Sequence, residues 1–151
     1  MLDPELTGLV LTTNLVTTLY MTGLIWFVQL VHYPLMAQVG ESGYVAYQNA
    51  HMARTAWAVG PAMLLEAASA LALVLCLPMG TQLALAWRAF VLLIIVWVAT
   101  AAFSVPAHNK LMGAFDSTAH RRLVLTNWIR TFGWSARAII VTCIFHFHYS
   151  H

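Results

Sequence analysis

The chain has 151 residues, of which 61% are hydrophobic and only 8% are charged. A soluble domain carries about a quarter charged residues, so this composition excludes an ordinary soluble protein and indicates an integral membrane protein with one domain over residues 1–151. The seven Lys and Arg residues are scattered, which excludes a nucleic-acid-binding surface. We therefore expect the lipid bilayer to be the main partner.

The first predicted membrane span covers about residues 9–35, within a stretch at 7–40 that has no charged residue. The residues before it are acidic, whereas a cleavable signal peptide begins with basic residues, so we expect this helix to be retained. Its polar residues share one helix face, which should point into the protein because lipid cannot satisfy them. They are Asn14, Thr18, Thr22, Gln29 and His32.

The second span is predicted over about residues 56–77, after a more polar first part of the same helix. His51, Arg54 and Glu66 lie on one face of this helix. The residues between them on that face are alanines, which leave room for a cavity or a close helix contact. The Gly60-Pro61 pair in the middle should bend the helix.

The third span is predicted over about residues 83–105 and the fourth over about 123–145. The fourth contains two arginines, and a guanidinium deep in hydrocarbon costs at least about 2.5 kcal/mol. The polar side chains of this span must therefore face protein or water, and they lie in a narrow arc of one helix face. They are Asn127, Arg130, Trp134 and Arg137.

Four spans with short turns predict an all-α fold, an integral membrane four-helix up-down bundle with both termini on one side. Two of the connections hold most of the basic residues, so the positive-inside rule places these connections in the cytoplasm and both termini outside. The basic residues concerned are Arg54, Lys110, Arg121 and Arg122. A homo-oligomer is compatible with this arrangement.

Glu66 is the one acidic residue inside an apolar run. Counted at about 1.5 Å per residue from the basic helix ends, Glu66 and Arg130 reach similar depths, so we predict a buried ion pair between them. The pair either fixes only the helix register, or acts catalytically by relaying protons or orienting a polar group. Two arginines facing one glutamate leave a positive surplus, which favours an anionic ligand group such as a carboxylate, a propionate or a quinone oxygen. The predicted ligand-binding residues are Gln29, Arg54, Asn127, Trp134 and Arg137.

Four histidines, one from each helix, are expected at the cytoplasmic end of the bundle. Imidazole is the commonest metal ligand and the usual haem ligand, so they could hold copper, zinc or iron, or form the axial pair of a haem. A pH-sensitive hydrogen-bond cluster and ordinary interfacial residues are the alternatives, because no ligand-pair spacing is present. These histidines are His32, His51, His108 and His120.

Two cysteines, Cys76 and Cys143, lie near helix ends on the same predicted membrane side. They point in different directions relative to the polar faces of their helices. The sequence therefore favours two buried apolar thiols over a disulfide.

Four segments resemble a group of small four-span bacterial membrane proteins that carries no established activity. They are residues 29–35, 51–66, 105–108 and 127–137. In size and layout the chain also resembles anthrone-oxygenase-like membrane proteins and four-helix, haem-containing protoporphyrinogen-oxidase-type proteins. The resemblance implies a bacterial inner-membrane location and a bundle able to host redox chemistry on a flat hydrophobic substrate.

Three classes of function are open at this point. The first is a membrane oxidoreductase of redox or oxygenase type, in which His32, His51 and His108 hold haem, copper or iron. In it, Arg130 and Glu66 would orient an amphipathic aromatic or isoprenoid molecule. The second is a small proton-coupled or ion-coupled transporter or channel-like oligomer. The third is a non-catalytic subunit of a membrane complex, whose buried pair locks the bundle.

Overall fold

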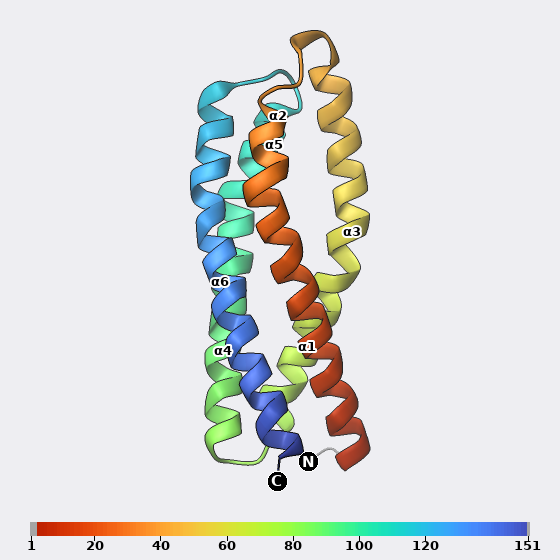
Figure 1. Ribbon diagram of the computed structural model, residues 1–151, viewed down its shortest axis with the longest axis vertical. Coiled ribbons are helices and arrows are strands. Elements are labelled where there is room, and N and C mark those ends of the chain that lie inside the picture. The colour runs from red at the N-terminus through yellow and green to blue at the C-terminus, as the bar shows by residue number, and fades with distance from the viewer. Residues whose placement is uncertain (1–2, 151) are drawn as a thin grey trace.

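The computed structural model describes residues 3–150, and these consist of helices joined by short turns. Figure 1 shows the long helical segments lying side by side, with both marked chain ends at the bottom of the view. The predicted all-α fold with four helices is confirmed. In chain order the elements are α1 (Pro4–Phe27), a π-helical segment η1 (Val28–His32), α2 (Tyr33–Met36), α3 (Glu41–Cys76), α4 (Thr81–Ala99), a second π-helical segment η2 (Thr100–Ser104), α5 (Val105–Leu111) and α6 (Ser117–Tyr149).

Three of the helical segments are long and apolar enough to cross a membrane. They are the continuous runs Pro4–Met36, Glu41–Cys76 and Thr81–Leu111. The fourth predicted span, about residues 123–145, lies in α6, which does not belong to this set. The reason is compositional, because Asn127, Arg130 and Arg137 interrupt its apolar run and point inward.

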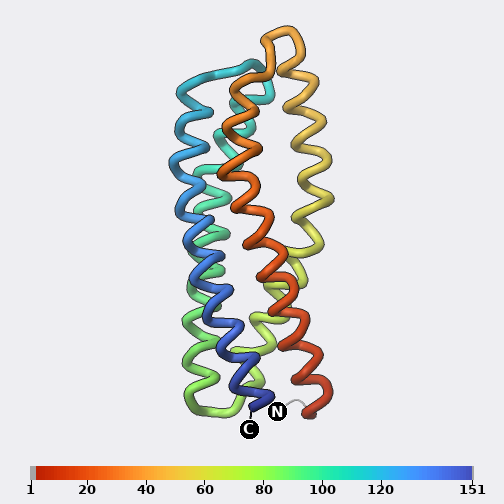
Figure 2. Tube along the Cα trace, viewed as in Figure 1, coloured from red at the N-terminus to blue at the C-terminus, as the bar shows by residue number. Residues whose placement is uncertain are grey.

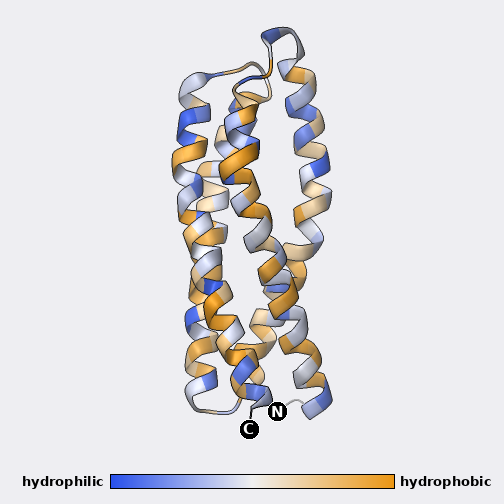
Figure 3. Ribbon diagram, viewed as in Figure 1, coloured by the Kyte–Doolittle hydropathy of each residue, from blue (hydrophilic) through white to orange (hydrophobic). Residues whose placement is uncertain are grey.

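The outer surface is apolar while the interior holds polar side chains. Trp57 on α3 is 82% exposed and Leu75 is 71% exposed, and Figure 3 shows that apolar residues occur along the whole length of the helices. By contrast, several polar residues are at most 1% exposed. They are Asn14, Thr18, Gln48, Glu66, Asn127, Thr131 and Arg137. The interior also contains apolar core clusters, so the difference from a soluble bundle lies in the apolar exterior and the buried charges, which fit a lipid-facing surface.

Each π-helical segment ends two residues before a proline. Pro34 is the second residue of α2, after η1, and Pro106 is the second residue of α5, after η2. A proline lacks an N–H and its ring clashes with the carbonyl four residues back, and the wider π turn accommodates this without ending the helix. The third helical run therefore continues to Leu111, beyond its predicted end at about residue 105.

The α3 helix contains Pro61 and, as predicted, changes direction near its middle (Figure 2). Just before the proline, the Tyr20 hydroxyl of α1 donates a hydrogen bond to the Ala58 carbonyl at 3.2 Å. From residue 49 to residue 65 no side chain is buried. Residues 49–65 of α3 therefore pack loosely against the rest of the bundle.

The last connection leads into α6 through a capped helix start. The Asp116 carboxylate accepts the Ala119 N–H at 2.7 Å and pairs with Lys110 at 2.6 Å. These contacts, the Lys110 hydrogen bond first, hold the pKa of Asp116 below its usual value.

Both cysteines are free thiols, with Cys76 partly buried and Cys143 exposed. The prediction of two buried thiols is therefore wrong for Cys143. Its side of α6 faces outward, because the opposite face carries the buried residues Val141 and Ile144.

The contact between α4 and α6 depends on Gly133. A Cβ atom built on Gly133 would lie 2.6 Å from Cγ2 of Val96, so a side chain there would push the two helices apart. We expect Gly133→Ala to lower the free energy of unfolding by roughly 1–3 kcal/mol, measured by denaturant titration in detergent. Gly23→Ala is the matched control, because nothing lies within 4 Å of its Cβ position. Equal stability of the two variants would contradict the proposed close contact.

Candidate functional site

The charged side chains in the interior belong to two separate sites. The first, which we call the Glu66 cluster, consists of Asn14, Thr18, Glu66, Trp134 and Arg137. Oε1 of Glu66 accepts hydrogen bonds from Nε of Arg137 at 2.8 Å and from the Thr18 hydroxyl at 2.9 Å. Its Oε2 accepts the Trp134 indole N–H at 3.1 Å. The carboxylate thus has three donors and a cationic partner.

The Glu66 cluster connects all four long helices. Arg137 of α6 also donates to the Ala89 carbonyl of α4 at 2.6 Å and to Oδ1 of Asn14 on α1 at 3.3 Å. Asn14 in turn donates to the Ser69 hydroxyl of α3 at 2.9 Å. Both Glu66 and Arg137 have side chains that are 0% exposed. The cluster is closed to solvent and its charges neutralise each other. This arrangement is typical of an ion pair with a structural role, which holds the helices together.

The predicted pairing of Glu66 with Arg130 is wrong, because Arg137 occupies that position. Glu66 lies 25 residues into α3, about 37 Å along the helix, whereas Arg137 and Arg130 lie 20 and 13 residues into α6, about 30 Å and 20 Å. The turn into α3 also rises above the connection into α6 (Figure 1). Both facts place Glu66 nearer the level of Arg137.

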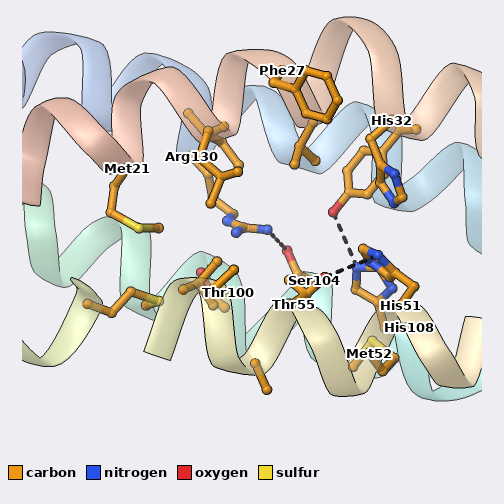
Figure 4. Close-up of a pocket in the computed structure, with 18 of the residues that line it drawn as sticks. Met21, Phe27, His32, His51, Met52, Thr55, Thr100, Ser104, His108 and Arg130 are labelled. Atoms are coloured by element: carbon orange, nitrogen blue, oxygen red, sulfur yellow. Dashed lines mark hydrogen bonds between the residues drawn. The ribbon is translucent and has the colours of Figure 1, made fainter. Parts of the chain in front are cut away.

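The second site is a cavity of about 370 Å³ between the upper halves of the helices, which we call the Arg130 cavity. Its walls come from α1, η1 and α2, from residues 51–63 of α3, from η2 and α5, and from α6. Figure 4 shows Arg130 reaching across it toward Ser104, with the histidines at one end and Met21 at the other. Most of the lining is apolar, including Met21, Leu24, Ile25, Val28, Val59 and Met63.

Arg130 is held in the cavity without a carboxylate partner. Its Nη1 donates to the Ser104 hydroxyl at 2.9 Å, and its guanidinium carbon lies 5.5 Å from the centre of the Trp134 ring. The Nε atom is buried and has no hydrogen-bond partner. Among residues 3–150, the two ion pairs are Arg137 with Glu66 and Lys110 with Asp116. The positive charge of Arg130 is therefore uncompensated within the described chain.

Three of the four predicted histidines meet at the end of the cavity. The rings of His32 and His51 are stacked, with centroids 4.2 Å apart, and the centroids of His51 and His108 are 5.5 Å apart. His120 lies elsewhere, with Nε2 2.8 Å from the Tyr33 carbonyl and its ring against Phe115. The predicted cluster of four is thus reduced to three, because the ring of His120 turns toward the backbone of Tyr33.

The three histidines do not converge on a common point. Both ring nitrogens of His108 have partners, since Nε2 lies 3.2 Å from the Tyr33 hydroxyl and Nδ1 lies 3.1 Å from Nε2 of Gln48. His32 and His51 face each other through their ring planes, whereas the lone pairs that bind metal lie in those planes. Within residues 3–150, no group of three or more His, Cys, Asp or Glu side chains is placed to hold a metal ion. Metal or haem binding stays a prediction.

The other predicted ligand-binding residues are dispersed. Arg54 is exposed and lies outside the cavity lining. Gln29 and Asn127 are buried but bind each other, with Nδ2 of Asn127 donating to Oε1 of Gln29 at 2.7 Å. Trp134 stands between the two sites, with its N–H on Glu66 and its ring near Arg130. Of the predicted set, only Trp134 therefore touches both sites.

Sequence reasoning missed several contributors to the Arg130 cavity. Ser104 bonds to Arg130, and Tyr33 and Gln48 fix His108. A usable signal was present, because both π-helical segments precede prolines and both contribute cavity residues. An X-Pro pair inside a long apolar run indicates a local widening of the helix, and such sites are frequently functional.

We expect Glu66→Leu or Arg137→Leu alone to destabilise the protein by about 3–5 kcal/mol, because each leaves a buried charge without its partner. The double variant should lose less than the sum of the two and fold better than either single variant. Denaturant unfolding in detergent measures all three. Additive losses would contradict the coupling that the 2.8 Å contact implies.

The chain matches no family model, no curated protein and no solved structure. The resemblances named for the sequence therefore stay predictions. The case for a function depends on the geometry and charge of the Arg130 cavity.

Proposed function

We propose that the protein is an up-down four-helix bundle embedded in a membrane, which binds an amphipathic small molecule in the Arg130 cavity. In this arrangement the end with the basic connections lies in the cytoplasm and both termini lie outside, in a bacterial inner membrane. The observation that carries the proposal is an apolar cavity that contains one cation without a counter-charge.

The shape and lining of the cavity support a small-molecule ligand. Its volume of about 370 Å³ lies within the range of about 300–1000 Å³ typical of ligand sites, which are mostly apolar with a few placed polar groups. Here the polar groups are the guanidinium of Arg130, the Ser104 hydroxyl and the histidine rings. A molecule with an apolar body and one polar head matches that distribution.

Residues 49–65 of α3 give such a molecule a route from the bilayer. None of these residues is buried, although their inner face lines the cavity. Two apolar lining residues on the neighbouring segments are also exposed, Phe27 at 55% and Val105 at 44%. A ligand dissolved in lipid reaches the cavity past apolar side chains without crossing a charged surface.

The Glu66 cluster does not favour the transporter hypothesis. A proton path through Glu66 needs a position where the carboxylate can exchange its partner, and all its observed contacts are buried. A purely structural role of the protein does not explain why Arg130 faces the cavity without a counter-charge. A redox reaction on the bound molecule stays a prediction, and its test is the absorption spectrum and metal content of the purified protein.

Filling the cavity should abolish binding. The test compounds are three amphiphiles with a twelve-carbon chain, dodecanoate, dodecanol and methyl dodecanoate. We expect them to stabilise the wild-type protein in lipid nanodiscs, and we expect Val59→Trp, on the cavity wall, to remove this stabilisation. A ligand present at about 100 times its Kd adds about 2.7 kcal/mol, which thermal unfolding detects as a shift of several degrees.

Val98→Trp is the matched control, because Val98 is 58% exposed on α4 and does not line the cavity. It should keep the wild-type shift for each amphiphile. If none of the amphiphiles stabilises the wild type, or if both variants lose the shift equally, the cavity is not the binding site for molecules of this kind.

A further inference from the structure

The two inward-facing arginines of α6, the buried Arg137 and the partly buried Arg130, differ in charge balance. Arg137 is neutralised by Glu66 at 2.8 Å, in a cluster that is closed to solvent. Arg130, two helical turns earlier, faces a cavity whose lining includes no acidic residue. A buried cation is stable when it has a counter-charge or strong hydrogen-bond acceptors, and the Ser104 hydroxyl is a single neutral acceptor. The cavity thus carries a surplus of one positive charge.

The donors of Arg130 are only partly used. Nη1 is engaged by Ser104, while Nε is buried and has no partner. A second buried polar atom at the cavity, Nε2 of His32, also lacks a partner. Buried polar atoms are nearly always hydrogen-bonded, so these two indicate a group that is bound in use. A guanidinium edge recognises a planar carboxylate through paired N–H donors.

We propose that the ligand is a membrane-soluble carboxylic acid whose carboxylate is bound by Arg130, with its apolar body lying along Met21, Ile25, Val59 and Met63. This inference deepens the proposed function and rests on it. The carboxylate supplies the missing negative charge and an acceptor for the free Nε. The apolar body fills the part of the cavity that offers no hydrogen-bond donor.

Two other classes of ligand fit less well. A phosphate monoester carries up to two negative charges and would exchange a positive surplus for a negative one in a low-dielectric site. A small inorganic anion balances the charge but leaves the apolar wall uncovered, whereas ligand sites bury most of their contents against apolar side chains. A carboxylic acid with a long or branched apolar body satisfies both the charge and the wall.

The test compares dodecanoate with its methyl ester, which has the same apolar chain and no charge, by the Tm shift in nanodiscs at a pH where the acid is ionised. Hydrogen bonds to charged groups are worth about 1.5–3 kcal/mol, so dodecanoate should bind the wild type about tenfold to a hundredfold more tightly than the ester. Arg130→Gln should remove this preference while binding of the ester persists. Arg121→Gln, at an exposed arginine, is the control and should keep the preference.

Each outcome separates this inference from the proposed function. If acid and ester bind the wild type equally, and Val59→Trp abolishes both, the cavity binds amphiphiles but the carboxylate assignment is wrong. If sodium acetate or chloride gives the same shift as dodecanoate, the site binds small anions and the assignment is also wrong. If no amphiphile binds at all, the proposed function itself fails. A preference for the acid that survives Arg130→Gln would place the anion elsewhere.

Discussion

The cost of an unpaired charge in a low-dielectric interior governs this molecule. Glu66 is buried among four helices, and it is tolerated there because Arg137, Thr18 and Trp134 all donate to its carboxylate. Each donor comes from a helix that must hold one depth and one rotation to reach it. The same contact that neutralises the charge therefore sets the register of α1, α3 and α6.

Once Glu66 and Arg137 are paired, no acidic side chain is left beside Arg130, because none lines its cavity. The two arginines share a face of α6 but lie two turns apart. Arg137 therefore binds Glu66, while Arg130 faces the cavity. Trp134 lies between them and contacts both, with its N–H on the carboxylate and its ring near the second guanidinium. The Glu66 cluster thereby holds the Trp134 ring beside Arg130.

The cavity exists because three parts of the backbone depart from straight α-helix. Pro61 bends α3, and residues 49–65 around this bend pack loosely. The π turns before Pro34 and Pro106 let the first and third helical runs continue past a proline. Those turns bring His32 and His108 to the end of the cavity. A tightly bonded Glu66 cluster next to a more loosely packed Arg130 cavity is the arrangement expected where a ligand must enter and leave.

The amino-acid sequence was enough to predict long apolar helices and their inward faces. Composition predicts the helices, and periodicity correctly places Asn14, Glu66, Asn127 and Arg137 inside, because an apolar outer surface cannot satisfy polar side chains. Helical periodicity gives the direction of a side chain but not its depth. The packing of the helices is needed to show that Arg137 rather than Arg130 binds Glu66, and that His120 stands apart from the other histidines. Depth depends on where each helix begins, bends and widens, and those features arise from packing between segments far apart in the chain.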